Sequence, residues 1–280
     1  MNVIVLAAGF AKRLWPLTKD RAKPLLEVGG RPVLDHLLER ALRAVDTLAS
    51  CETITLVTNA RFANDFELWA RQHESQRSVN VVANDAFEVD DARGALVDLA
   101  LALEHTDTAQ GGTMVLAGDN LIDFELVPHL RAHLAEGEGR ATVLARRVAG
   151  VVPPARHGEI VVDRPFDATT QEHASWRSVT RFREKPAEPE SDLVATAIYF
   201  FPEGLADDLR MFLESVPMND KRRDAPGHFL GYLAERGLLG ATLIEGRLFD
   251  IGNLEALEAA RASYESSSDR STRRPSDAAT

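Results

Sequence analysis

The segment that follows the first apolar run combines small residues with positive charges. Ala7, Ala8 and Gly9 are small enough to let backbone N–H groups approach an anion, and Arg13 and Lys23 follow as cations. This composition is typical of a loop that holds phosphate. The segment has neither the G-x-x-x-x-G-K-S/T of a P-loop nor the G-x-G-x-x-G of a dinucleotide site. A surface loop with scattered cations therefore stays open as the alternative.

Two aspartates each come directly after a short apolar run. Asp119 stands in VLAGDN and Asp250 stands in LFDIGN. Carboxylates at two strand ends can converge on one Mg²⁺, which keeps most of its ligand sphere as water and substrate phosphate. Each aspartate alone is also compatible with a turn or a helix cap. Because both occur in the same setting, the pattern favours a metal site.

Hydrophobic periodicity predicts the elements that position these residues. In the first half, strand-like segments alternate with helix-like segments, which indicates parallel strands joined by right-handed crossovers. We expect strands at 3–7, 53–58, 79–82 and 113–117, and helices at 33–45, 62–71 and 94–104, the last capped by Asp90 or Asp91. Open parallel sheets bind ligands beyond the carboxyl ends of their strands. The cationic loop and Asp119 both follow such ends.

The second half has more strand-like than helix-like segments. Strands are expected at 141–147, 159–162, 178–183, 193–201 and 246–251, and helices at 205–215, 228–236 and from 253. The prediction is an α/β fold with a doubly wound, mainly parallel Rossmann-like sheet and antiparallel additions in the second half. Residues 1–265 form one domain. Residues 266–280 have no apolar face, so we expect a disordered tail.

Composition excludes several classes of protein. The net charge of −11 disfavours a sequence-independent grip on nucleic acid, although a local cluster of cations can still bind a free nucleotide. No apolar run is long enough to span a bilayer, and no signal peptide precedes the first strand. The single cysteine, Cys51, is expected to be a core residue in a reducing compartment. We therefore expect a cytoplasmic protein without a membrane or nucleic-acid partner.

A pair of histidines in HLRAH is a weak metal signal. His129 and His133 are four residues apart, but the acid of H-E-x-x-H is missing. We expect them on a solvated helix face.

The segment LAAGFAKRLWPLT, followed by KPLL, resembles the signature of the nucleotide-sugar pyrophosphorylases, which are sugar-1-phosphate nucleotidyltransferases. AGDN, GEIVVD, FREKP, ATAIYFF and LFDIGN follow in that family's order and at similar separations, so the resemblance covers about residues 2–263. It implies a Mg²⁺-dependent enzyme that transfers a nucleotidyl group from a nucleoside triphosphate to a sugar 1-phosphate and releases pyrophosphate. The sequence is similar to members of the family that transfer thymidylyl or uridylyl groups, which favours dTTP or UTP with a hexose 1-phosphate. Members of this family are often oligomers, so the resemblance is compatible with a homo-oligomer.

The resemblance also implies roles for individual residues. Arg13 would hold the β- and γ-phosphates, Lys23 the α-phosphate and Lys185 the phosphate of the sugar, while Asp119 and Asp250 would hold Mg²⁺. The remaining implied residues line pockets: Leu6, Ala7, Ala8, Gly9, Lys12 and Gly94 on the nucleotide side, in about residues 1–135, and Gly158, Glu184 and Thr196 on the sugar side, in about residues 136–265.

The sequence departs from the family pattern at three positions. Ala11 and Lys12 replace a glycine and a threonine or serine, and Val97 stands where thymidylyl- and uridylyl-transferring relatives often have glutamine. Lys12 can touch phosphate or point into water, and the choice of base stays open.

Two other functions remain as alternatives. A cytidylyltransferase acting on phosphocholine or inositol phosphate shares the opening signature, although FREKP and ATAIYFF favour a sugar. A catalytically silent sensor or regulatory subunit would have no reason to keep Arg13, Lys23, Asp119 and Asp250 together.

Overall fold

The computed structural model describes residues 1–51, 53–73, 77–107, 111–166 and 174–272. Within these residues the main element is a nine-stranded sheet in the order β5-β4-β1-β6-β11-β8-β12-β10-β9. Its strands are β1 (Asn2–Leu6), β4 (Thr53–Thr58), β5 (Ser78–Ala83), β6 (Thr113–Ala117), β8 (Ala141–Arg147), β9 (Glu159–Val162), β10 (Arg177–Arg183), β11 (Leu193–Phe201) and β12 (Leu239–Leu243). Two short two-stranded sheets pair β2 (Glu27–Val28) with β3 (Arg31–Pro32), and β7 (Asn120–Ile122) with β13 (Leu248–Asp250).

The two halves of the sheet differ in strand direction. β5, β4, β1 and β6 are parallel neighbours, as the alternating pattern predicts. Beyond β6, β11 runs antiparallel to both β6 and β8, and β9 pairs with both β10 and β11. The α/β class and the antiparallel additions are confirmed, and the sheet as a whole is mixed rather than mainly parallel.

One strand of the main sheet was not expected. β12 has the sequence LGATL and lies parallel to β8 in a fully buried position. Its small residues carry little strand propensity, so packing between β8 and β10 rather than local preference determines its conformation. The expected strand at 246–251 is the short β13, which pairs with β7 outside the main sheet.

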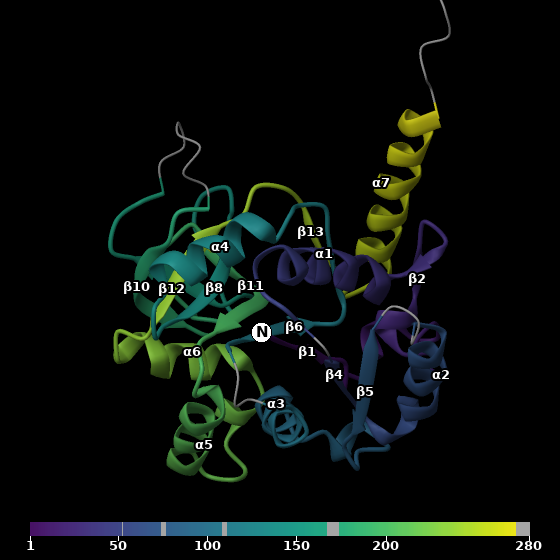
Figure 1. The fold of residues 1–280 in the computed structure, drawn as a ribbon, viewed down its shortest axis with the longest axis horizontal. Coiled ribbons are helices and arrows are strands. Elements are labelled where there is room, and N and C mark those ends of the chain that lie inside the picture. Colours follow the sequence, from purple (N-terminus) through teal and green to yellow (C-terminus); the bar gives the residue numbers. More distant parts are fainter. Residues whose placement is uncertain (52, 74–76, 108–110, 167–173, 273–280) are drawn as a thin grey trace, which may run out of the picture.

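Helices cover both faces of the sheet (Figure 1). On one face lie α1 (Val33–Leu48), α2 (Ala63–His73) and α4 (Val127–Glu136), and on the other lie α3 (Ala95–Glu104), α5 (Leu205–Ser215) and α6 (Pro226–Glu235). The apolar spacing expected for α1 becomes a buried stripe that includes Leu34, Leu37 and Ala41. Cys51 is buried in the same core, as expected. No helix among the described residues is long and apolar enough to cross a membrane.

His129 and His133 correct the expectation of a solvated helix face. Both rings are buried beneath α4, where Nδ1 of His129 lies 3.0 Å from Thr242 Oγ1 and Nδ1 of His133 lies 2.9 Å from Thr142 Oγ1. Burial lowers the pKa of each imidazole to about 4. The two histidines are neutral core residues, because burial disfavours the charged imidazole and a threonine of β8 or β12 pairs with each ring.

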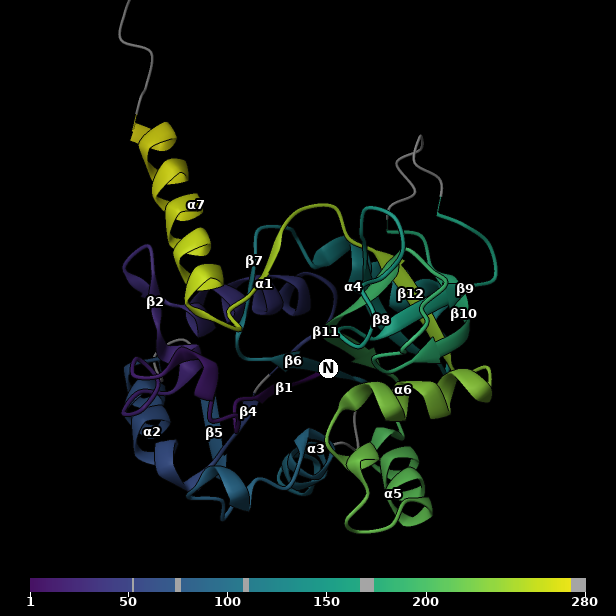
Figure 2. The same ribbon diagram turned by 180° about the vertical axis from the view of Figure 1, so that it is seen from behind.

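The last helix, α7, runs from Leu254 to Thr272. Its first turns pack Leu257 and Ala260 against Val28 and Leu121, and its far end projects away from the sheet in both views (Figures 1 and 2). Residues 266–272, expected as part of a disordered tail, are therefore helical. The rest of that expected tail, 273–280, lies outside the described residues.

Candidate active site at the carboxyl ends of the strands

The loop after β1 forms two short 3-10 turns, Lys12–Leu14 and Lys23–Leu25. Ala11 has a φ of 47°, a left-handed conformation that favours glycine and costs an alanine free energy. Its carbonyl accepts hydrogen bonds from Leu14 N and Thr18 Oγ1, which hold this conformation. Lys12 and Arg13 are exposed and make no ion pair with the described part of the chain.

The Lys23 side chain occupies the centre of the site. It is largely buried, and its Nζ lies 2.5 Å from Asp119 Oδ2 and 3.4 Å from Asp250 Oδ1. The pairing of β7 with β13 places Asp250 opposite Asn120, which brings both aspartates to the end of β6. Gly118 fits closely at this point, since a Cβ there would lie 3.0 Å from Val5 Cγ1 and would require Val5 to shift. Two elements far apart in sequence thus deliver one pair of carboxylates.

Arg13 belongs to the same cluster. An ideal Cβ built on Gly252 would lie 3.4 Å from Arg13 Nη2 and 3.5 Å from Asp250 Oδ2, so the guanidinium and the carboxylate flank this glycine together. The four residues Arg13, Lys23, Asp119 and Asp250, predicted from separate motifs, are brought together by the fold.

The carboxylate pair suits a hard divalent cation. Asp119 and Asp250 both face the Lys23 ammonium. Among the described residues no group of three or more His, Cys, Asp or Glu side chains could hold a metal. Mg²⁺ commonly takes one or two carboxylates and completes its octahedron with water and phosphate oxygens. The donor set therefore fits Mg²⁺ that arrives with a phosphorylated ligand.

A cavity of about 540 Å³, which we call the loop-side cavity, lies between this loop and α3. It is lined by every residue predicted for the nucleotide side, namely Leu6, Ala7, Ala8, Gly9, Lys12, Arg13, Gly94 and Asp119. Gly94 caps α3 with a φ of 94°, and a Cβ there would lie 2.6 Å from the Arg223 carbonyl oxygen. Only glycine fits this approach.

A second cavity of about 440 Å³, the strand-side cavity, adjoins the first and shares Asp119 with it. It is lined by Gly158, Glu184, Lys185 and Thr196, the residues predicted for the sugar side, and also by Asp250. Glu184 is mostly buried and sits against two glycines, since a Cβ on Gly227 would lie 1.9 Å and one on Gly158 3.3 Å from its Oε2. Lys185 Nζ lies 3.5 Å from Glu184 Oε1, and Thr196 Oγ1 donates to the Leu144 carbonyl at 2.8 Å.

The comparison with protein families decides the membership of the chain. The model described as "Nucleotidyl transferase" matches residues 2–267. The chain belongs to the nucleotidyl transferase family. This agrees with the resemblance seen in the sequence and with the two adjoining cavities.

Individual relatives are distant in sequence. The mannose-1-phosphate guanyltransferase of Pichia angusta is 29% identical over 218 residues, which cover 77% of this chain and 53% of the relative. The enzyme of the same name from Candida albicans is 28% identical over 256 residues, covering 90% and 61%. The chain thus spans between half and two thirds of the length of these curated relatives.

Solved structures show the same fold. A UDP-glucose pyrophosphorylase in complex with UDP-glucose superposes with a TM-score of 0.76 at 18% identity, covering 95% of this chain and 98% of that structure. At this identity the likeness concerns the fold alone.

Sequence reasoning missed several residues of this nucleotidyl transferase site. Arg146, Arg156 and His157 line the strand-side cavity, and burial, with help from Arg146, lowers the pKa of His157. Asn120 is buried there with an Nδ2 that has no partner among the described residues. Strand direction could have pointed to Arg146. Because β8 runs in the same direction as β6, its carboxyl end places Arg146 at the edge of the sheet where Asp119 lies.

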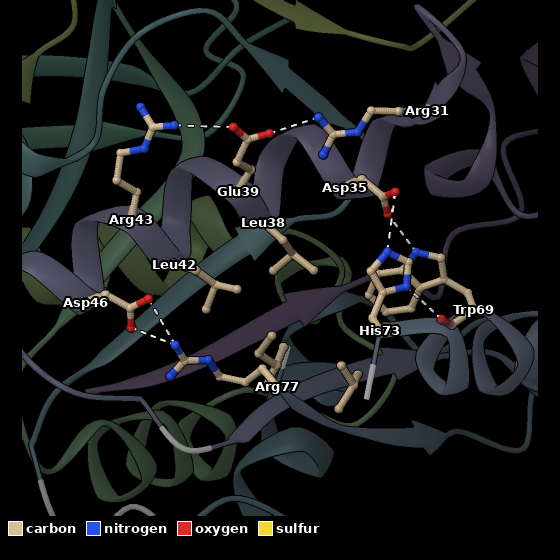
Figure 3. A pocket seen from close by; sticks show the side chains of 12 residues that line it. Arg31, Asp35, Leu38, Glu39, Leu42, Arg43, Asp46, Trp69, His73 and Arg77 are labelled. Atoms are coloured by element: carbon tan, nitrogen blue, oxygen red, sulfur yellow. Dashed lines mark hydrogen bonds and ion pairs between the residues drawn. The ribbon is translucent and has the colours of Figure 1, made fainter. Parts of the chain in front are cut away.

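The molecule has a third hollow of about 470 Å³, the helix-side cavity, between α1, α2 and the edge of the sheet (Figure 3). Glu39 bridges Arg31 and Arg43, and Arg77 binds Asp46. Asp35 accepts a hydrogen bond from Trp69 Nε1 and faces His73. Each charged side chain that lines this cavity therefore has a hydrogen-bond or ion-pair partner within the chain.

Proposed function

We propose that this nucleotidyl transferase joins a nucleoside triphosphate to a sugar 1-phosphate, giving an NDP-sugar and pyrophosphate with the help of Mg²⁺. The observation that carries the proposal is the meeting of Arg13, Lys23, Asp119 and Asp250 where the loop-side and strand-side cavities join. A triphosphate in one cavity and a sugar phosphate in the other would bring their phosphates to these four side chains.

The reaction needs positioning and charge more than a nucleophilic side chain. An oxygen of the sugar phosphate attacks the α-phosphorus, a new P–O bond forms, and the bond from the α-phosphorus to the pyrophosphate oxygen breaks. Cations that are already in position before the reaction lower the repulsion between the sugar phosphate and the triphosphate. They also stabilise the negative charge on the departing pyrophosphate. Arg13 is assigned to the β- and γ-phosphates, Lys23 to the α-phosphate and Lys185 to the sugar phosphate.

Other side chains complete the assignment. Asp119 and Asp250 would hold Mg²⁺, which when bound neutralises phosphate charge beside the reacting centre. Glu184 would accept a hydrogen bond from a sugar hydroxyl, and Gly158 and Thr196 would form the wall of the sugar pocket. Lys12, exposed at the rim of the loop-side cavity, is free to contact the terminal phosphate.

The strand order supports this division of labour. β5-β4-β1-β6 with helices on both faces is the arrangement of one half of a doubly wound nucleotide-binding sheet. We assign residues up to about 135 to the nucleotide and those from about 136 to 265 to the sugar.

The relatives favour GTP with mannose 1-phosphate over the dTTP or UTP expected from the sequence. Relatives found by sequence, such as those of Pichia angusta and Candida albicans, carry the name mannose-1-phosphate guanyltransferase, whereas the uridine-linked neighbour is similar in fold only. The base is therefore assigned from the sequence relatives.

The test is pyrophosphate release from a matrix of GTP, UTP, dTTP, ATP and CTP against mannose 1-phosphate, glucose 1-phosphate and phosphocholine, with and without Mg²⁺. We expect release with GTP and a hexose 1-phosphate, dependent on Mg²⁺. Release with CTP and phosphocholine alone would instead establish a cytidylyltransferase. Nucleotide binding without release in any combination would establish a silent sensor.

A further inference from the structure

A buried carboxylate lines the loop-side cavity from α3, whereas the cations line it from the loop after β1. Asp98 lies in the first turn of α3, is only 8% exposed and lines the cavity together with Val89, Ala92 and Gly94. Arg13 and Lys23 line the same cavity from the loop, and Lys23 lies beside Asp119, which the strand-side cavity shares. A triphosphate held by these cations would leave the α3 wall, with Asp98, to its base.

The Asp98 carboxylate is held in place by one neighbour. Asn84 Nδ2 donates to Asp98 Oδ1 at 2.6 Å. The Asn84 amide is itself oriented, because its Oδ1 accepts from Ala86 N at 3.0 Å and its backbone N–H donates to the Thr58 carbonyl at 2.9 Å. Asp98 makes no ion pair with the described residues. It thus keeps hydrogen-bond acceptor capacity for a ligand in the cavity.

An ionised carboxylate only accepts hydrogen bonds, and this restricts the bases that it can recognise. Guanine presents two adjacent donors, N1–H and the 2-amino group. Uracil and thymine present a single N–H flanked by two carbonyl oxygens, and the amino groups of adenine and cytosine stand beside an acceptor nitrogen. A carboxylate at this position pairs with guanine at two points and opposes a carbonyl oxygen of the pyrimidine bases.

We propose that Asp98 is the residue that selects guanine, accepting hydrogen bonds from N1–H and the 2-amino group of the base. This rests on the proposed function in that it takes the loop-side cavity to be the nucleoside triphosphate site. Burial raises the pKa of Asp98, while the hydrogen bond from Asn84 opposes that rise. The paired donors of guanine favour the ionised form in the same way that Asn84 does.

The experiment measures equilibrium binding by calorimetry, with the full chain, Mg²⁺ and no sugar phosphate. GTP is compared with ITP, which differs only by lacking the 2-amino group, and with UTP. Asp98→Asn keeps the volume and removes the charge. Asp65→Asn is the matched control, because Asp65 also lies in the first turn of a helix, also has a pKa raised by burial, and lines neither cavity of the site.

We expect the unmodified chain to bind GTP about tenfold or more tightly than ITP, since one hydrogen bond to a charged acceptor is lost. Asp98→Asn should weaken GTP binding roughly 10- to 100-fold and ITP binding less, so that the GTP-to-ITP ratio falls toward one. UTP binding should stay the same or tighten, because its carbonyl oxygen no longer opposes a carboxylate. Asp65→Asn should leave all three affinities within about twofold, the size expected for a remote surface change.

Equal affinity of the unmodified chain for GTP and ITP would overturn the assignment, and this comparison needs no variant to fold. An equal loss for GTP, ITP and UTP in Asp98→Asn would also overturn it, because a purely structural role affects every nucleotide alike. Failure of the proposed function looks different, since turnover would be absent with every sugar phosphate while the GTP-to-ITP ratio and its loss in Asp98→Asn persist.

Discussion

The loop-side and helix-side cavities are similar in volume, at about 540 and 470 Å³, yet differ in how the chain treats their charges. In the helix-side cavity Glu39, Asp46 and Asp35 are each bound by cationic or N–H groups of the same chain (Figure 3). In the loop-side cavity Arg13 has no ion-pair partner among the described residues, and Lys23 is shared by two carboxylates. The volume of a cavity alone does not identify a ligand-binding site. Charged side chains that the chain leaves available to a ligand do.

The largest effect that follows from this comparison is on turnover. Lys23→Ala should lower the rate of pyrophosphate release roughly 10²- to 10³-fold, because a cation placed at the reacting phosphate is lost. Arg77→Ala in the helix-side cavity should leave the rate within about twofold and lower the free energy of unfolding by about 1 kcal/mol, since only its ion pair with Asp46 and its hydrogen bond to the Cys51 carbonyl are lost. Steady-state kinetics and urea unfolding of both variants measure the contrast. Equal rates of pyrophosphate release in the two variants would contradict the predicted contrast between the two cavities.

His129 and His133 are titratable groups that, like the charges of the helix-side cavity, have partners within the chain. Their pKa values near 4 lie below the ordinary value of 6.5, so each is neutral in the folded chain and gains a proton on unfolding at lower pH. Stability is complete above about pH 6.5 and falls as the pH drops toward 4, by about 2 to 3 kcal/mol for the pair between pH 7.5 and 5.5.

Urea unfolding at the two pH values measures this loss. His133→Gln should remove about half of it, because one of the two titrating groups is gone. A pH dependence that is the same in the variant would show that other groups are responsible.

The strand-side cavity should respond through substrate affinity. Lys185→Ala is expected to raise the KM for the sugar 1-phosphate about tenfold, the equivalent of one charge-assisted contact, with a smaller change in the KM for the nucleotide. Arg181→Ala is the matched control, because Arg181 is also an exposed cation with an acidic neighbour but lines neither cavity of the site. A rise in both KM values would place Lys185 on the nucleotide rather than on the sugar.

Much of the site could be predicted because its motifs are local. The loop with Arg13 and Lys23 follows a strongly apolar strand and Asp119 follows β6, so parallel-strand topology sufficed to bring these residues to one edge. Asp250 was recognised by its motif, but the antiparallel pairing of β13 with β7 is what brings it there. β12 could not be predicted, because small buried residues carry no strand signal of their own.

The missed side chains depend on distant partners. His129 becomes a core residue through Thr242, and Asp98 becomes a fixed acceptor through Asn84 at the end of β5. A helical spacing in one chain shows which residues share a face, but the partner that the face meets comes from another part of the sequence.

The smallest expected effect concerns the strained loop. Ala11→Gly should raise the free energy of unfolding by up to about 1 kcal/mol, because the left-handed conformation costs alanine more than the extra freedom of glycine costs the unfolded chain. Ala155→Gly, at the second left-handed alanine among the described residues, should behave in the same way, and Ala155 lines neither cavity of the site. A lower free energy of unfolding in both Ala11→Gly and Ala155→Gly would contradict the inference that the left-handed conformation strains alanine.

The most direct test of the central claim is pyrophosphate release from GTP and mannose 1-phosphate by the unmodified chain, Asp119→Asn and Asp46→Asn. Both substitutions remove one carboxylate from a cavity, but only Asp119 meets Lys23 where the loop-side and strand-side cavities join. We predict that Asp46→Asn keeps the rate within about twofold and that Asp119→Asn lowers it by at least about 100-fold. Equal rates for the two variants would contradict the assignment of the charged junction as the active site.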